Sequence, residues 1–108
     1  MSYKIIFTSD GLRDAKKLRK KYPTFKNDLG LLINLLQEEP QQGESLGKDC
    51  FKIRLAIGSK NRGKRGGARV ITCVKIVDET VYLIAIYDKS EANTITDGDL
   101  TDRILNIP

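Results

Sequence analysis

The sequence predicts an α+β domain in which a helical hairpin covers one face of a small, largely antiparallel sheet. Two observations support this prediction: apolar residues recur at helical spacing between residues 9 and 36, and strand-like segments lie before and after that region. The length of 108 residues suits a single domain, 1–108, and 40% hydrophobic with 31% charged residues is typical of a globular protein. We therefore expect the element order β-α-α-β-β-β-α.

The N-terminal third predicts one strand followed by two helices. Residues 3–8 alternate in polarity, as in a half-buried strand with one apolar face. The first helix starts at Ser9, which can cap it, and ends before Pro23. The second helix follows the potential cap Thr24 and ends before Pro40. The apolar faces consist of Tyr3, Ile5 and Phe7 in the strand, Leu12, Ala15, Leu18 and Tyr22 in the first helix, and Phe25, Leu29, Leu32, Ile33 and Leu36 in the second.

The remainder predicts an antiparallel meander that follows a polar loop, residues 41–49. Its strands comprise residues 51–56, 69–77 and 81–87. A tight turn at residues 78–79 joins the last two strands. Residues 81–87 are almost entirely apolar, which predicts a central strand buried on both faces. Residues 97–104 are expected to form a short terminal helix.

Positive charge is concentrated in residues 48–69. This segment holds eight of the nineteen basic residues, one of the fourteen acidic residues and four glycines, as expected of a surface that binds phosphate groups. A solvated loop that only keeps the protein soluble would have a similar composition. Strand alternation, however, places Lys52 and Arg54 on one exposed face about 7 Å apart. Because Arg69 opens the next strand and Lys89 follows the last one, four cations are expected to share that face.

Other classes of protein receive little support from the sequence. Cys50 and Cys73 lack the CxxC spacing of metal or redox motifs, so buried free thiols are expected, with no metal and no other cofactor. The N-terminus lacks the apolar core of a secretory signal, and the longest apolar run is too short to span a bilayer. We expect a cytoplasmic protein without a membrane partner.

At these residues the sequence resembles the RelE/ParE superfamily of bacterial toxin–antitoxin toxins, and in particular its RelE-like and HigB-like mRNA interferases. The resemblance covers nearly the whole chain and rests on the strand order and on four local features. These features are the aromatic, Lys, apolar, basic, Leu pattern within residues 50–55, Arg69 at the start of the next strand, the turn at residues 77–79, and residues 87–91 at the end of the last strand. It implies the RelE-like microbial RNase fold and an endoribonuclease that cuts messenger RNA in the ribosomal A site. It also implies a cognate antitoxin, and the net charge of +5 is compatible with an acidic partner.

The resemblance assigns catalysis to Lys52, Arg54, Arg69 and Lys89. The chain contains no histidine, so the general acid and base must be Lys, Arg, Tyr or a carboxylate. We expect the RNA 2′-hydroxyl to attack the adjacent phosphate without a metal, leaving a 2′,3′-cyclic phosphate and a free 5′-hydroxyl. The arginines suit stabilisation of the transition state because they stay protonated and can bind two phosphate oxygens. Lys52 is then the expected proton acceptor, and Lys89 would assist the leaving oxygen.

A basic loop, residues 57–66, stands where compact relatives have only a short turn. HigB-like members resemble this chain at that place. Its glycines permit close backbone approach, and its cations suit ribosomal RNA. A disordered loop tip is the alternative interpretation, and it is compatible with the same role because such a loop can order on binding. The predicted RNA-binding residues are Lys60, Arg62, Lys64 and Arg65 in this loop, and Tyr87, which either stacks on a base or packs in the core.

One position departs from the pattern of the family. Ile95 stands where the best-known RelE-like sequences have a tyrosine that stacks on the cleaved nucleotide, so a weaker or differently built activity is compatible with the sequence. Two alternatives therefore stay open. A ParE-like inhibitor of DNA gyrase shares the fold, although Lys52 and Arg54 argue against it, and a non-catalytic RNA-binding relative is favoured by Ile95.

Overall fold

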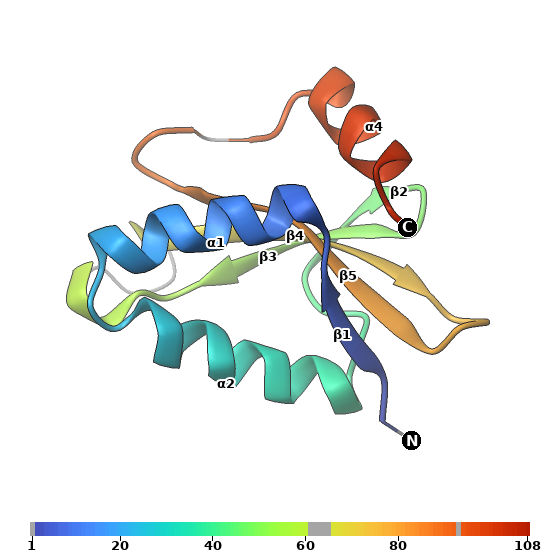
Figure 1. Cartoon of the computed structure of the whole chain (residues 1–108), viewed down its shortest axis with the longest axis horizontal. Helices are drawn as coiled ribbons and strands as arrows, with labels where there is room; N and C mark the ends of the chain where they lie inside the picture. The colour runs from blue at the N-terminus through green and yellow to red at the C-terminus, as the bar shows by residue number, and fades with distance from the viewer. Residues whose placement is uncertain (1, 61–65, 93) are drawn as a thin grey trace.

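The protein forms a five-stranded mixed sheet with helices on both faces (Figure 1). The computed structural model describes residues 2–60, 66–92 and 94–108. The elements are β1 (Lys4–Phe7), α1 (Ser9–Lys21), α2 (Phe25–Glu38), β2 (Glu44–Gly47), β3 (Cys50–Leu55), the short 3₁₀ helix η1 (Gly58–Lys60), β4 (Ala68–Lys75), β5 (Thr80–Asp88) and α4 (Asp97–Leu105). The predicted α+β class and element order are confirmed, with one strand added.

The order of strands in the sheet is β1-β5-β4-β3-β2. β1 runs parallel to β5, with Lys4 opposite Thr80, whereas every other neighbouring pair is antiparallel. β5 therefore has a partner on each side, and seven of its nine residues are buried. This arrangement confirms the central strand that the apolar run predicted.

The added strand, β2, lies in the segment that was predicted to be a polar loop. It pairs with β3, so that Glu44 lies opposite Lys52, and its register shifts between Ser45 and Gly47. Lys48 and Asp49 adopt left-handed conformations, with φ of 56° and 61°, and reverse the chain between the two strands. The loop prediction was wrong because β2 has only four residues and no alternation of apolar and polar side chains. Such a short edge strand forms through its hydrogen bonds with β3, and the local sequence does not indicate that partner.

Two hydrophobic cores lie on opposite faces of the sheet. The larger one is formed by α1 and α2 against the sheet and consists of Ala15, Leu18, Phe25, Leu29, Leu32, Leu36, Ile53, Leu55, Ile57, Ala68, Val70, Val74, Val81, Leu83 and Ile86. The second core lies under α4 and consists of Cys50, Ile71, Cys73, Ile84, Ala85 and Leu100. No helix in the described ranges is long and apolar enough to cross a bilayer.

The N-terminal cap of α1 is Thr8 rather than the predicted Ser9. Thr8 Oγ1 accepts a hydrogen bond from the Gly11 amide at 3.1 Å and donates one to the Leu83 carbonyl at 3.2 Å. The cap therefore also fixes α1 to β5. Gly11 permits this close approach, because a Cβ atom at that position would lie 2.0 Å from the Leu83 carbonyl oxygen.

Candidate active site

Arg54, Arg69 and Tyr87 lie next to one another across three adjacent strands. Arg54 of β3 is directly opposite Arg69 of β4, and Arg69 is directly opposite Tyr87 of β5. Residues in direct opposition project from the same face of a sheet, with Cβ atoms about 4.5–5.5 Å apart. We call these three residues the cross-strand row. Tyr87 packs against the second core, so the row lies on the face of the sheet that α4 also covers.

The two arginines of the row form a non-hydrogen-bonded pair, which is the antiparallel pairing with the shorter Cα–Cα distance. The Val74 amide donates to the Asp49 carbonyl at 2.9 Å, which makes these opposed residues a hydrogen-bonded pair. Hydrogen-bonded and non-hydrogen-bonded pairs alternate along an antiparallel ladder, so Arg54 and Arg69, five positions further, are a non-hydrogen-bonded pair. Side chains in such pairs approach one another more closely.

Arg69 is the buried member of this pair of cations. The residue is 4% exposed, and one guanidinium nitrogen donates to the Ala68 carbonyl at 3.1 Å, whereas Arg54 is exposed. Burial and the neighbouring charge of Arg54 both lower the pKa of Arg69. Two cations held together in this way raise the free energy of the protein, and a bound anion would relieve the repulsion.

Lys52 and Lys89 border the row. Lys52 lies two residues before Arg54 on the same face of β3, and its Nζ atom is 3.7 Å from Glu44 Oε2. The Lys89 backbone N–H donates to the Gly67 carbonyl at 3.0 Å, which places this residue beside the start of β4. The structure thus gathers the segments that carry the four predicted catalytic residues. Glu44 was not anticipated, because it is positioned by the strand that the sequence did not predict.

Tyr87 and Ile95 occupy neighbouring positions at the α4 side of the row. Both side chains are half-buried and pack against the second core. The Tyr87 hydroxyl lies next to Thr94 and Ile95, and burial raises the pKa of Tyr87. Core packing of the Tyr87 ring is therefore observed, and the neighbouring position, where the resemblance leads one to expect a tyrosine, is filled by the aliphatic side chain of Ile95.

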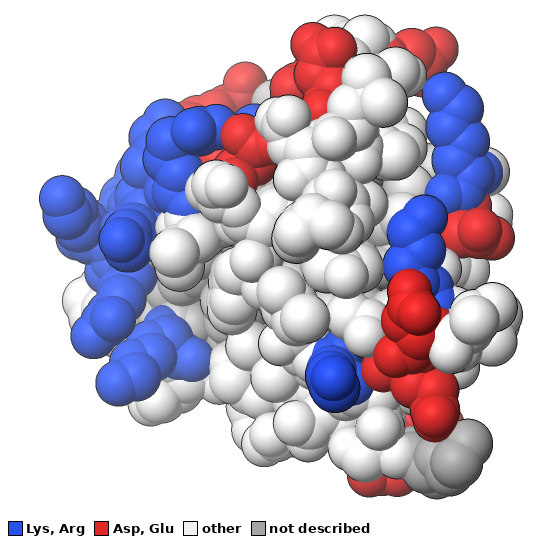
Figure 2. All heavy atoms as spheres, turned by 45° about the vertical axis from the view of Figure 1, so that its right-hand side comes forward, with Lys and Arg blue, Asp and Glu red and all other residues white. Residues whose placement is uncertain are grey.

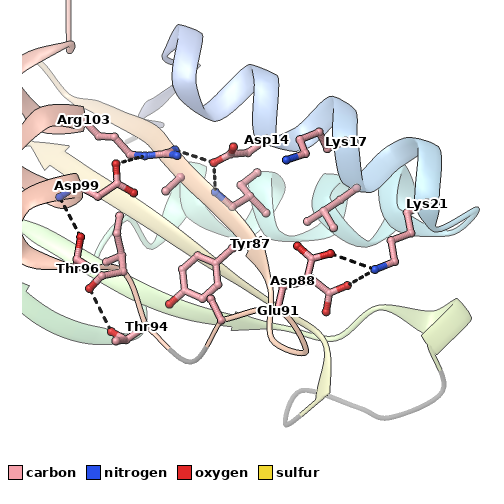
Figure 3. Close-up of a pocket in the computed structure, with 15 residues that line it drawn as sticks. Asp14, Lys17, Lys21, Tyr87, Asp88, Glu91, Thr94, Thr96, Asp99 and Arg103 are labelled. Carbon is pink, nitrogen blue, oxygen red and sulfur yellow. Dashed lines mark hydrogen bonds and ion pairs between the residues drawn. The ribbon is translucent and has the colours of Figure 1, made fainter.

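A cavity of about 310 Å³ separates α1 from the segment that leads into α4 (Figure 3). Its charged side chains are largely paired with one another: Arg103 lies 2.6 Å from Asp14, and Lys21 lies 3.2 Å from Asp88. Tyr87 is the one predicted site residue that lines this cavity among the residues that the structure describes. We interpret the cavity as a junction between elements, because two of its three cations, Lys21 and Arg103, already have carboxylate partners.

Lys60 is positioned differently from the expectation of an exposed cation in the basic loop. Its side chain is 8% exposed, and its Nζ atom lies 2.6 Å from Asp88 Oδ1. Asp88 is itself 1% exposed and also accepts hydrogen bonds from Tyr22, Lys21 and Ser90. The Lys60 ion pair therefore fixes the start of the loop to β5 and α1. The other three predicted loop residues, Arg62, Lys64 and Arg65, lie outside the described residues.

The environment of Asp88 strongly favours its charged form. Burial alone would raise the pKa of this carboxyl, but hydrogen bonds from Lys60, Tyr22 and Ser90 outweigh burial and hold the pKa well below its ordinary value. Hydrogen bonds to Asp88 and then to Glu91 raise the pKa of Lys21. Asp88 therefore contributes to stability only while it is ionised.

Acid is expected to destabilise the protein through Asp88. In the unfolded chain this carboxyl takes up a proton at about pH 4, as an ordinary aspartate does, whereas in the folded protein it stays ionised, so protonation below that pH favours the unfolded chain. The stabilisation is complete above about pH 5 and decreases progressively as the pH falls below about 4, down to the lowered pKa of the folded carboxyl. Thermal melts across this range should show a steeper loss of Tm for the wild-type chain than for Asp88→Asn. Equal slopes of Tm against pH in the two proteins would contradict the assignment of this acid sensitivity to Asp88.

A second basic surface accompanies the site. α1 carries six basic residues, all exposed, and two acidic residues. Both acids are engaged, because Asp10 lies 2.6 Å from Arg13 and Asp14 lies 2.6 Å from Arg103. Figure 2 shows one group of basic side chains at the left of the molecule and a second set, interspersed with acidic side chains, at the right.

Comparison with known proteins identifies the fold. No protein-family model and no curated protein matches the chain. The chain is similar to a mutant of the toxin RelE from E. coli in the free state, with 21% identity, complete coverage of both chains and a TM-score of 0.64. It is also similar to the isolated E. coli RelE toxin, with 22% identity over 95% of this chain and 99% of that chain and a TM-score of 0.60. The toxin–antitoxin complex RelBE2 from Mycobacterium tuberculosis matches with 20% identity over 82% of this chain and 92% of that chain and a TM-score of 0.59. The protein thus has the fold of the RelE toxins, as the resemblance in its sequence implied.

Proposed function

We propose that this protein is the toxin of a toxin–antitoxin system and that it cleaves messenger RNA on the ribosome. The observation that carries the proposal is the opposed pair of Arg54 and Arg69, one exposed and one buried, on a RelE fold. Such a pair is unfavourable in the free protein and becomes favourable when a phosphate group lies between the guanidinium groups. The basic surface of α1 supports the same proposal, because its cations can bind the backbone of ribosomal RNA.

The proposed reaction is attack of the RNA 2′-hydroxyl on the adjacent phosphorus. The bond from phosphorus to the 5′-oxygen breaks, which leaves a 2′,3′-cyclic phosphate and a free 5′-hydroxyl. The transition state carries more negative charge on its phosphoryl oxygens than the substrate does. Arg54 and Arg69 therefore stabilise it more than they stabilise bound RNA, which is the condition for catalysis.

Proton transfer is proposed to involve the two lysines that border the row. Lys52 accepts the proton of the 2′-hydroxyl, and Lys89 donates a proton to the leaving 5′-oxygen. Glu44, whose side chain is 70% exposed, is the present partner of Lys52 and would be displaced by the phosphate. The Tyr87 ring, next to Arg69 in the row, would border the nucleotide at the cleaved bond.

Mapping of messenger ends after induction in cells tests the proposal. Primer extension should detect new 5′ ends within translated codons, and these ends should carry hydroxyl groups that require phosphorylation before ligation. Arg54→Ala should abolish the cuts, whereas Lys4→Ala, which changes an exposed cation on the edge strand β1, should leave them unchanged. A DNA-damage response without cuts would instead support a gyrase inhibitor and overturn the proposal.

A non-catalytic RNA-binding relative is the second candidate. Ile95 favours it, because an aliphatic side chain can neither stack as an aromatic ring does nor transfer a proton. The same mapping experiment separates the two candidates. Ribosome binding and growth inhibition without new messenger ends would establish the non-catalytic candidate.

The proposed partner is an antitoxin that binds in a groove beside the row. The groove has a volume of about 890 Å³ and lies between α2 and the edge of β3. Its floor and walls include Leu31 and Leu35, which are 71% and 43% exposed, and the cations Lys52 and Arg54. A segment with apolar and acidic side chains would complement both groups. Its binding would cover Lys52 and Arg54, and so would inactivate the toxin by exclusion of RNA.

Leu31→Asp is expected to weaken antitoxin binding by about tenfold or more, because it places a charge in the apolar part of the groove. Toxicity in the absence of antitoxin should be unchanged. Calorimetric titration with the antitoxin encoded next to this protein measures the effect. Val77→Asp is the matched control, since Val77 is 97% exposed in the turn between β4 and β5 and should bind as the wild type does. Equal affinity of the two variants would place the antitoxin elsewhere.

A further inference from the structure

Cys50 and Cys73 form an opposed pair on β3 and β4. Both are free, both are 0% exposed, and each is the register partner of the other. They follow directly after the hydrogen-bonded pair of Asp49 and Val74, so they occupy a non-hydrogen-bonded position. Cα atoms in such a position are about 4.5 Å apart, within the range of about 4.4–6.8 Å that a disulfide spans.

The two thiol groups also point to the same place. Cys50 Sγ and Cys73 Sγ lie 3.5 Å and 3.9 Å from the carbonyl oxygen of Lys48. The interaction between the two thiols lowers the pKa of Cys73 and, together with burial, raises the pKa of Cys50. Cys73 is therefore the member of the pair that loses its proton more readily, and the thiolate is the reactive form.

We propose that Cys50 and Cys73 are a redox modification site that closes to an intramolecular disulfide on reaction with hydrogen peroxide. The Cys73 thiolate attacks one peroxide oxygen, the O–O bond breaks, and the products are a sulfenic acid and hydroxide, which takes up a proton to form water. The Cys50 sulfur then gives up its proton and attacks the sulfenic sulfur, and the S–O bond breaks to release a second water. Two thiols and one peroxide thus yield one disulfide and two waters.

The disulfide would join the two strands that carry most of the candidate active site. The closed segment, residues 50–73, contains Lys52, Arg54, Arg69 and the whole basic loop. The bond would stabilise the folded protein, because it restricts the unfolded chain across this segment. This inference does not depend on the proposed function, since it rests on the positions of two sulfur atoms.

Access to the thiols is expected to limit the rate of oxidation. Both sulfurs lie against Lys48, in the turn between β2 and β3, and neither residue is exposed to solvent. Peroxide reaches them only when this turn opens, which is a local and reversible event. Urea below the unfolding transition should therefore accelerate the reaction.

The test treats the reduced full-length protein with hydrogen peroxide, with and without mild urea. Disulfide formation should lower the intact mass by about 2 Da and raise the Tm by roughly 10 °C, and dithiothreitol should reverse both changes. Proteolytic digestion without reduction should yield one crosslinked peptide that contains both cysteines. Cys73→Ser, an isosteric control, should show neither the loss of mass nor the rise in Tm.

Three results would overturn the inference. They are a protein that keeps both thiols under all these conditions, a gain of oxygen mass on separate cysteines, and disulfide-linked dimers in place of an internal bond. Cys50→Ala provides a second variant if Cys73→Ser does not fold. It should likewise form no internal crosslink.

Discussion

Arg69→Ala is expected to lower messenger cleavage by a factor of about 100 to 1,000 and to relieve growth arrest. Arg69 lies between Arg54 and Tyr87 in the cross-strand row, so its removal withdraws the central donor to the phosphate. Single-turnover cleavage of a programmed ribosome measures the loss. Growth of cells after induction provides an independent measurement.

Stability of the Arg69 variants separates a catalytic role from a structural one. The lowered pKa of Arg69 means that its protonated guanidinium is less stable in the folded protein than in the unfolded chain. Arg69→Met, which keeps most of the volume and removes the charge, should therefore abolish cleavage in a protein that remains folded at the assay temperature. A variant that loses cleavage only because it unfolds would contradict the catalytic assignment. Retained cleavage in folded Arg69→Met would contradict it equally.

Asp88→Asn is expected to destabilise the fold by about 3–5 kcal/mol. The substitution leaves the Lys60 ammonium, whose side chain is 8% exposed, without its carboxylate partner at 2.6 Å. For a domain of this size the loss corresponds to a fall in Tm of more than about 10 °C. Thermal and urea denaturation at neutral pH measure the effect.

Glu91→Gln is the matched control for Asp88→Asn. Glu91 also pairs with Lys21, at 3.3 Å, but its side chain is 65% exposed, so its loss should change the free energy of unfolding by less than about 1 kcal/mol. Adding Lys60→Met to Asp88→Asn should restore part of the stability, because no unpaired charge is then buried. Similar Tm values for Asp88→Asn and Glu91→Gln would show that the buried ion pair is not important for the fold.

The helices and central strands could be predicted because their apolar residues recur with a local period. The stripe from Leu12 to Tyr22 and the run from Val81 to Tyr87 follow periods that need no information from elsewhere in the chain. The cap of α1 was misplaced by one residue, because Thr8 and Ser9 are equally suited to that role and the contact of Thr8 with Leu83 decides between them.

The candidate site could be predicted only in part. Alternation within β3 places Lys52 and Arg54 on one face of the strand. The position of Arg54 opposite Arg69 depends on the pairing register of β3 with β4, and the sequence of the loop between these strands does not determine that register. The pairing of Lys60 with Asp88 was missed because it joins η1 to the end of β5, 28 residues later, and no local pattern in the sequence indicates such a contact. The same residue type, lysine, therefore serves as a solvent-facing cation in one place and as the partner of a buried carboxylate in another.

The parallel pairing of β1 with β5 affects how the protein is made. β1 includes residue 4 and its partner strand β5, the last strand in the described part of the chain, begins at residue 80, so β1 cannot dock until β5 has been synthesised. Contacts between such distant segments slow folding, because the chain loses conformational entropy when it closes the long loop, before the contact contributes any stabilisation. A nascent chain that ends at β4 lacks the strand on which both β1 and α1 pack, and it also lacks Tyr87 and Lys89. A prematurely terminated product that ends at β4 therefore has neither the complete sheet nor the full set of site residues.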